Sequence, residues 1–259
     1  MTPLYDSHCH LDAPEFDPDR TAVVARARAA GVQWQLVPAV TRASWPKLRE
    51  ACVLDDGLLP AYGLHPMFLD EHRDSDLDDL ADWLARERPA AVGECGLDYF
   101  VEGLDPARQR HFLQGQLDLA RRFDLPVVLH ARRAVDDVIG HLRRTGGLRG
   151  VVHSWSGSEE QARQLFDLGF HLGIGGPVTF ERAQRLRRTV ASMPIELLLL
   201  ETDAPDQPGA GHRGQRNEPG YLPEVLAVVA ELRRESPEAI AEATTANARR
   251  LFVRRPAAA

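Results

Sequence analysis

Lysine and cysteine are both scarce in this chain of 259 residues. Lys47 is the only lysine, and the remaining basic residues are arginines. The three cysteines, Cys9, Cys52 and Cys95, lack C-x-x-C spacing and are odd in number, which argues against a zinc knuckle or a disulfide framework. Free thiols favour a reducing compartment. Because no apolar run approaches 18 residues and no signal peptide is visible, we expect a cytoplasmic protein without a membrane span.

The chain also lacks the positive charge of a protein that coats nucleic acid. Its formal net charge is −7, so its overall field repels a phosphate backbone and any such contact must be local. This excludes a duplex-coating protein but not an enzyme that holds one strand end. An apolar fraction of 44% is ordinary for a globular protein, and a chain of this length builds a core without structural disulfides.

Eight short apolar segments alternate with longer amphipathic stretches, which is typical of parallel βαβ units. Helix signals lie between them: Ser158 stands three residues before Gln161, and Asp105-Pro106 opens a helix that we expect to reach Phe123. The predicted strands are Leu4–His10, Gln33–Val40, Leu58–Leu64, Ala91–Cys95, Pro126–His130, Gly150–His153, His171–Ile174 and Ile195–Glu201.

Eight such units favour a single (β/α)8 TIM barrel of the metallo-dependent hydrolase type, as one domain over residues 1–259. The length is also close to that of a typical barrel of this class. A doubly wound open sheet is the alternative, because periodicity does not report whether a sheet closes. No linker or low-complexity segment divides the chain.

Six of the eight predicted strands end in a histidine or a carboxylate. In a barrel these ends meet at one face, where active sites of this fold are found. Buried charges without partners cost several kcal/mol each, so a cluster of this kind favours bound cations over a set of core polar residues. The strand-end residues are His8, His10, His65, Glu94, His130, His153 and Asp203.

His8 and His10 are two residues apart, so on an extended strand their side chains point the same way while Cys9 points away. Such a pair can bind one cation. We expect Cys9 and Cys95 to be small apolar filler. The other histidines, His72, His111, His141, His171 and His212, lie away from the strand ends or have no supporting neighbour.

The longest segment without helix or strand pattern runs from Ala204 to Glu218, directly after the eighth predicted strand. Long loops in compact domains are often functional. Arg213, Arg216 and Asn217 are able to contact an anion here, as is Arg132 after the fifth strand. A solvent-exposed loop with surface salt bridges is the alternative interpretation.

These motifs resemble the TatD family of metal-dependent hydrolases, the TatD-type deoxyribonucleases, within the wider amidohydrolase-like barrels. The resemblance spans the chain, and the segment around ETDAPD and the loop after it is most similar to the YjjV-like branch. The matching motifs are DSHCHLD at 6–12, GLHP at 63–66, VGECGLDY at 92–99, LH at 129–130, HSWSGS at 153–158, ETDAP at 201–205, N-x-P at 217–219 and N-x-x-x-LF at 247–252.

The resemblance implies a binuclear site. His8, His10 and Asp203 would bind one divalent cation, and His130 and His153 the other. Glu94 would bridge them, with His65 just outside. The sequence independently disfavours a carboxylated lysine as the bridge, because Lys47 lies on a predicted helix far from the strand ends.

Two positions depart from the family pattern. His130 is followed by Ala131-Arg132-Arg133 instead of Ser-Arg-Asp or Ser-Arg-Glu, and Trp155 replaces a frequent phenylalanine. Neither position is a predicted ligand, but both are expected to line the mouth.

The resulting functional prediction is hydrolysis of a phosphodiester by water that a cation activates, with Asp203 as the general base and with Glu94 and His65 in the catalytic site. The resemblance favours a DNA 3′ end, cleaved as a 3′–5′ exodeoxyribonuclease. One alternative is a small ester, amide or lactone at the same site, and a more remote one is a non-catalytic metal-binding protein. Zn, Mn, Fe, Ni and Mg all remain open as the metal, and we expect a monomer.

Overall fold

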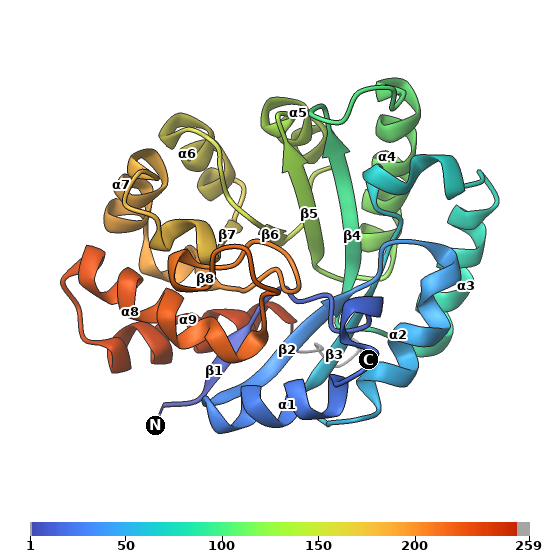
Figure 1. The fold of residues 1–259 in the computed structure, drawn as a ribbon. Helices are drawn as coiled ribbons and strands as arrows, with labels where there is room; N and C mark the ends of the chain where they lie inside the picture. The colour runs from blue at the N-terminus through green and yellow to red at the C-terminus, as the bar shows by residue number, and fades with distance from the viewer. Residues whose placement is uncertain (1, 253–259) are drawn as a thin grey trace, which may run out of the picture.

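The computed structural model describes residues 2–252, whose eight strands follow one another in sequence order around a barrel (Figure 1). Each strand pairs in parallel with the next, from β1 to β8. The strands are β1 (Leu4–Asp6), β2 (Val32–Pro38), β3 (Leu58–Tyr62), β4 (Ala91–Asp98), β5 (Val127–Arg132), β6 (Gly150–Val152), β7 (Phe170–Ile174) and β8 (Leu198–Leu200).

The first and last strands approach each other through the residues that follow them. The amide of Ser7 donates to the carbonyl of Leu200 at 2.9 Å, and Cys9 forms a parallel bridge with Ala204. The amide of His10 donates to the carbonyl of Ala204 at 2.8 Å. The sheet is thus nearly closed, which confirms the predicted (β/α)8 barrel over the doubly wound alternative.

Helices connect the strands and form the outer layer (Figure 1). They are α1 (Arg20–Ala29), α2 (Trp45–Cys52), α3 (Asp76–Glu87), α4 (Pro106–Arg122), α5 (Val135–Thr145), α6 (Glu159–Asp167), α7 (Gln184–Ser192), α8 (Leu222–Arg233) and α9 (Pro237–Phe252). Short 3-10 helices are η1 (Pro14–Phe16), η2 (Arg42–Ser44), η3 (Pro66–Glu71), η4 (Gly176–Thr179), η5 (Ile195–Leu197), η6 (Ala210–His212) and η7 (Pro219–Tyr221).

Two predicted helix starts are confirmed by their caps. The Asp105 carboxylate accepts the amide of Ala107 at 2.8 Å, with proline at the first position of α4. Ser158 and Gln161 bond each other's backbone amides at the start of α6, which is a complete capping box.

Three predicted strand boundaries differ from the structure by three residues or more, and the others by at most two. β1 ends at Asp6 instead of His10, because only the single bridge at Cys9 continues the pairing. β8 begins at Leu198, since the preceding residues form η5. β4 runs on to Asp98, three residues past the predicted end, because residues Cys95 to Asp98 pair with β5.

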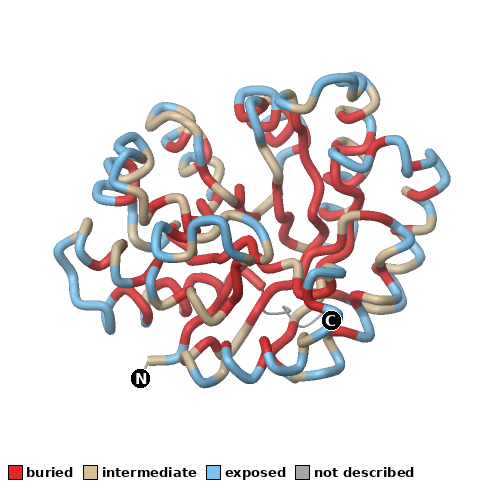
Figure 2. Tube along the Cα trace, in the orientation of Figure 1, coloured by how far each residue is buried: buried red, intermediate tan, exposed pale blue. Residues whose placement is uncertain are grey.

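The barrel interior holds an apolar cluster that collects residues from seven of the strands, including Tyr5, Leu36 and Val128. Helix α9 adds Phe252, whose ring lies 5.9 Å from that of Tyr5. A larger cluster fills the space between the strands and the helices. The strands are buried and the outer faces of the helices are exposed (Figure 2). Cys9 and Cys95 belong to the larger cluster, as expected of apolar filler.

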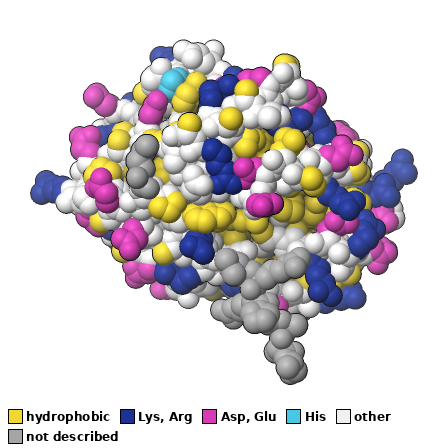
Figure 3. Space-filling model, turned by 90° about the horizontal axis from the view of Figure 1, so that it is seen from below, with side chains coloured by type: hydrophobic (Ala, Val, Ile, Leu, Met, Phe, Trp, Pro, Cys, Tyr) yellow, Lys and Arg dark blue, Asp and Glu magenta, His cyan; other side chains and the backbone are white. Residues whose placement is uncertain are grey.

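The face seen from below carries hydrophobic side chains across its middle and charges of both signs around them (Figure 3). Little histidine is visible on this face (Figure 3). Within residues 2–252, no helix has the length and apolar character that crossing a membrane requires.

Candidate metal centre

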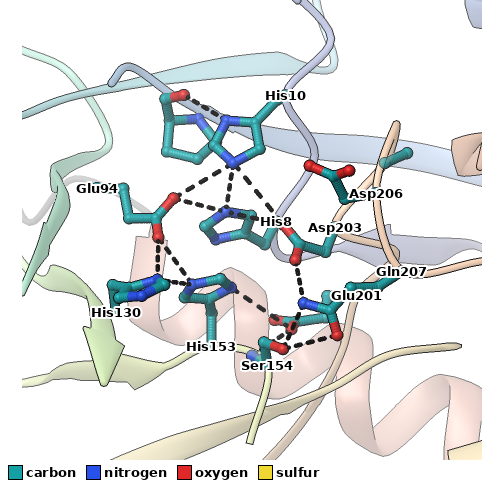
Figure 4. Close-up of polar contacts among 12 residues, drawn as sticks. His8, His10, Glu94, His130, His153, Ser154, Glu201, Asp203, Asp206 and Gln207 are labelled. Carbon is teal, nitrogen blue, oxygen red and sulfur yellow. Dashed lines mark hydrogen bonds and ion pairs between the residues drawn. The ribbon is translucent and has the colours of Figure 1, made fainter. Parts of the chain in front are cut away.

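Glu94 on β4 is the hub of the strand-end cluster (Figure 4). Its carboxylate is 1% exposed and both oxygens face histidines. Oε2 lies 3.1 Å from Nε2 of His8 and 3.3 Å from Nε2 of His10. Oε1 lies 2.8 Å from Nε2 of His153 and 3.1 Å from Nδ1 of His130. Four predicted ligands therefore surround the predicted bridge, two on each oxygen.

Asp203 completes the side of the cluster that contains the histidine pair. Its Oδ1 lies 3.5 Å from Nε2 of His8 and 3.7 Å from Nε2 of His10. The two ring nitrogens are 3.2 Å apart. The side chains of His8 and His10 do point the same way, although β1 has already ended, because the bridge at Cys9 keeps the backbone extended.

The tautomer of His10 leaves a lone pair aimed at negative oxygens. Nδ1 lies 3.1 Å from the carbonyl of Pro38, an acceptor, so Nδ1 carries the proton. The unprotonated Nε2 then faces Glu94 and Asp203. Burial lowers the pKa of His10, but these carboxylates raise it to about 9. A positive charge, carried by a second proton on Nε2 or by a cation in its place, therefore suits the position between Nε2 and the oxygens.

His130 shows the same arrangement on the other side. Its Nε2 lies 2.8 Å from Oδ2 of Asp98, so the proton is on Nε2. The lone pair of Nδ1 then faces Oε1 of Glu94 at 3.1 Å and Nε2 of His153 at 3.4 Å. A histidine whose outer nitrogen donates to a carboxylate is a typical metal ligand. The residues present thus fit one cation on each side of Glu94.

His65 is arranged as a donor and not as a ligand. Its Nδ1 accepts the amide of Met67 at 3.1 Å, so Nε2 carries the proton and donates to Oε1 of Glu94 at 2.8 Å. The carbonyl of His65 accepts Nε2–H of the buried His72 at 2.8 Å. This fits the predicted place of His65 just outside the cations.

The same histidines hold Glu94 in its ionised form. Burial by itself raises the pKa of Glu94, but His153, His65 and His8 hold it well below its usual range. The ring of His8 also stacks on that of His153, with 3.9 Å between centroids. The packing of the rings keeps the nitrogens converged on the carboxylate.

Two further buried carboxylates, Asp6 and Glu201, contact the predicted ligands or their neighbours, and the sequence did not single them out. Asp6 accepts the amides of His8 and Thr202 and the hydroxyl of Thr202, which ties the start of the histidine pair to the segment after β8. Glu201 is fully buried, with Oε1 bonded to the amide of Ser154 at 2.5 Å and lying 3.8 Å from Nδ1 of His153. Burial raises the pKa of Glu201 to about 8.

Gln207 connects Asp203 with Ser154, which follows the end of β6. Its Nε2 donates to Oδ2 of Asp203 and to the hydroxyl of Ser154, at 2.6 Å for the latter (Figure 4). Nothing in the local sequence distinguishes Gln207 from other loop residues. The loop fold alone brings it onto Asp203.

Asp98 was not predicted as a site residue, although its spacing from Glu94 was a usable signal. Glu94, Gly96 and Asp98 alternate along β4, so they share one face of the strand. The predicted end of the strand at Cys95 hid this pattern. Gly96 is required beside them, because a Cβ there would lie 2.0 Å from the carbonyl oxygen of His130.

The structure does not bring all four residues that were predicted to contact an anion to the cluster around Glu94. Arg132 is exposed and packs on Phe100, with 3.6 Å between its guanidinium carbon and the ring centroid. Arg216 bonds Asp19 and Glu218, which directs it toward α1. The Asn217 amide is buried and donates to the carbonyls of Thr202 and Asp206, so it holds the loop in shape. Arg213 is exposed on the same loop.

Lys47 does not lie where it could bridge two cations. It lies on α2 and its ammonium is 2.8 Å from Oδ1 of Asp17, a half-exposed surface carboxylate. His111 is exposed, and His141 and His171 lie outside the cluster, as the sequence predicted. His212 bonds Glu224 and stacks on Tyr221, away from Glu94.

Known proteins are similar to this chain in sequence over nearly its whole length. The model of the family described as TatD related DNase matches residues 5–253. An uncharacterized metal-dependent hydrolase, YjjV of Escherichia coli K12, is 44% identical over 251 residues, covering 95% of this chain and 96% of that one. A relative from Cronobacter sakazakii named 3′-5′ ssDNA/RNA exonuclease TatD is 35% identical to this chain, covering 97% and 98% of the two.

A solved structure agrees with both the fold and the family. The crystal structure of YjjV from Escherichia coli K12 superposes with a TM-score of 0.93 at 42% identity, covering 96% of this chain and 97% of that one. Coverage of this extent includes the strand ends that carry the site. The chain therefore belongs to the TatD family and is a metal-dependent hydrolase.

Proposed function

We propose that the centre binds two divalent cations, one on each side of Glu94. His8, His10 and Asp203 would hold the first, His130 and His153 the second, and Glu94 both. This proposal rests on two ring nitrogens, Nε2 of His10 and Nδ1 of His130, whose partner nitrogens carry the proton. The two nitrogens face opposite oxygens of the Glu94 carboxylate. Imidazole and carboxylate donors suit Zn, Mn, Fe or Ni, whereas Mg prefers more oxygen.

The reaction we propose is hydrolysis of a phosphodiester at a DNA 3′ end, as a 3′–5′ exodeoxyribonuclease. The printed name of the Cronobacter sakazakii relative supports a nucleic-acid substrate, since that relative is similar over nearly its whole length. Divalent cations, when bound, neutralise charge on the phosphoryl oxygens and lower the pKa of water to about 7. The chain itself would act from one domain, as a monomer, in the cytoplasm.

The residues around the cations have distinct parts in this proposal. The Asp203 carboxylate would accept the proton of the attacking water, and Gln207 orients this carboxylate by donating to its Oδ2. His65 offers its Nε2–H at the edge of the cluster, where it is able to move from Glu94 to a phosphoryl oxygen. Arg132 and Arg213, both exposed, are available to neighbouring phosphates, whereas Arg216 and Asn217 act through the shape of the loop.

The decisive experiment uses metal-stripped protein resupplied with Mg, Mn or Zn, and a 5′-labelled single-stranded oligonucleotide. We expect a ladder that shortens from the 3′ end and disappears in Glu94→Ala, with circular dichroism unchanged. Glu160→Ala removes an exposed carboxylate that contacts no residue of the cluster and should keep full activity. An active Glu94→Ala overturns the site. If the wild type hydrolyses a small ester, amide or lactone and no oligonucleotide, the substrate class is wrong.

A further inference from the structure

An arginine–aromatic cluster stands at the rim of the mouth, where β4 and β5 end side by side (Figure 1). It consists of Phe100, Arg132 and Arg133, and we call it the Phe100 platform. Phe100 is 44% exposed, an unusual exposure for a phenylalanine in this chain. The guanidinium carbon of Arg132 lies 3.6 Å from the ring centroid, and that of Arg133 lies 4.6 Å away.

The platform is tied to the metal centre by one carboxylate. Oδ2 of Asp98 bonds His130, a proposed ligand, at 2.8 Å. Oδ1 of the same residue accepts the amide of Phe100 at 2.8 Å. Asp98 also pairs with Arg132 in the β4–β5 register. Two short bonds through Asp98 therefore hold the backbone of Phe100 relative to His130.

The two arginines carry charge that the described residues leave uncompensated. Within residues 2–252, neither Arg132 nor Arg133 forms a hydrogen bond or ion pair with a carboxylate. Arg26 and Arg216, by contrast, share Asp19 and Glu218. Arg133 also has φ +55°, in the left-handed region that favours glycine. Two like charges packed on one exposed ring attract an anion.

A second exposed apolar group extends the same rim. Met67 and Phe68, after β3, are 42% and 38% exposed, and the ring of Phe68 lies 5.8 Å from that of His65. These residues follow β3, which pairs with β4, the strand that leads to Phe100. Flat apolar faces alternating with arginines are what a strand of unpaired bases and phosphates recognises.

We propose that the Phe100 platform binds single-stranded DNA, with a base stacked against the exposed part of the Phe100–arginine cluster and its phosphates held by Arg132 and Arg133. This inference rests on the proposed nuclease function and names the strand contact that the function requires. Local binding of this kind also explains how a chain of net charge −7 holds a polyanion. A single strand is favoured over a duplex because the interior bases of a duplex offer no free face for stacking.

The test measures binding separately from cleavage. The probe is a fluorescent, phosphorothioate-linked oligo-dT, which resists cleavage, titrated with metal-loaded protein and followed by anisotropy. We expect Phe100→Ala to weaken binding about 10-fold, since stacking on one aromatic residue has effects of that order. The double variant Arg132→Ala/Arg133→Ala should lower the salt slope of log K by about 1.4, because each phosphate that an arginine neutralises on a single strand adds about 0.7.

Three controls make the outcome decisive. Arg122→Ala removes a matched arginine–phenylalanine contact, 5.2 Å from the ring of Phe123 at the far end of α4, and should bind like the wild type. Hydrolysis of bis(p-nitrophenyl) phosphate, which lacks the neighbouring bases and phosphates of a strand, should be unchanged in Phe100→Ala. The conservative pair Arg132→Lys/Arg133→Lys should restore the salt slope but not the full affinity, because ammonium groups stack poorly.

The two proposals fail in different ways. Equal oligonucleotide binding by the wild type and Phe100→Ala, with exonuclease activity intact, overturns the platform and leaves the proposed function standing. Binding that is lost in Phe100→Ala, from a wild type that cleaves no oligonucleotide, supports the platform and overturns the exonuclease reaction. A wild type that does not bind oligo-dT overturns the platform outright.

Discussion

Asp98 holds His130 by a bond of 2.8 Å between Oδ2 and Nε2, and this contact decides which nitrogen of His130 faces Glu94. Burial raises the pKa of Asp98, but the bonds from His130, Val101 and Phe100 lower it to about 2. The carboxylate is therefore charged whenever the protein is folded near neutral pH. It fixes the histidine tautomer and increases the basicity of Nδ1.

Replacing Asp98 should consequently weaken metal binding. We expect Asp98→Asn to raise the dissociation constant of the cation held by His130 and His153 by 10- to 100-fold, the usual effect of losing such a partner. Isothermal titration of metal-stripped protein measures it. Asp118→Asn, on the exposed side of α4, is the matched control. Unchanged metal affinity in Asp98→Asn would remove the carboxylate from the centre.

Metal loading should stabilise the fold, because the cluster crowds lone pairs and carboxylates that cations would neutralise. A cation at 100 times its dissociation constant adds about 2.7 kcal/mol, or about 5–10 °C in Tm for a chain of this size. Differential scanning fluorimetry before and after chelation gives the shift. His10→Ala/His130→Ala should abolish it and His111→Ala, at an exposed position, should keep it. A Tm shift that persists in His10→Ala/His130→Ala would show that the metal binds elsewhere.

Gly173 on β7 gives Glu201 the room it needs beneath the histidines. A Cβ at this position would lie 2.0 Å from Oε2 of Glu201 and 3.1 Å from Cα of His153. Gly173→Ala should cost about 1–3 kcal/mol in unfolding free energy, as overpacking of a core does. Urea denaturation measures the loss, and reduced metal affinity should accompany it.

Gly140→Ala makes the same chemical change as Gly173→Ala but should have the opposite effect on the unfolding free energy. Gly140 lies inside α5, and an added Cβ would meet only the end of the Arg144 side chain, at 3.3 Å, which is free to swing away. Alanine favours a helix over glycine by about 0.5–1 kcal/mol, so this variant should be more stable than the wild type. Equal losses for the two variants would contradict the packing argument at Gly173.

Glu218 should make stability depend on pH in a defined window. Burial raises its pKa, but hydrogen bonds from Arg26 and Arg216 lower it below its ordinary value of 4.5. The folded state thus binds a proton less readily than the unfolded state. The stabilisation is present above about pH 4.5 and is lost as the pH falls through the lower, folded-state pKa.

Urea denaturation of Glu218→Gln between pH 7 and pH 3 tests this sign. The variant should be less stable than the wild type by about 1–2 kcal/mol near neutral pH, since charge-assisted hydrogen bonds are lost. The difference should shrink below pH 4.5. Glu238→Gln, at an exposed position on α9, should show no such trend. A difference that stays constant to pH 3 would assign the effect to packing.

The residues of the cluster were predictable because the chemistry sits at the ends of strands that the sequence marks clearly. His8, Glu94, His130 and Asp203 each follow an apolar run, and parallel strands bring such ends to one face. The starts of α4 and α6 were equally readable, because Asp105 and Ser158 cap their own helices within three residues. Local pattern and short-range bonding determine both features.

Relationships between distant residues were decided only by the tertiary structure. Closure of the barrel depends on Ser7 meeting Leu200, and periodicity carries no information on that contact. Arg216 was predicted to contact an anion, and the fold supplies Asp19, 197 positions away, as its partner. The Phe100 platform forms because β4 extends to Asp98 and pairs with β5 there. Side-chain type and spacing set what each residue is able to bind, and packing in three dimensions selects the partner.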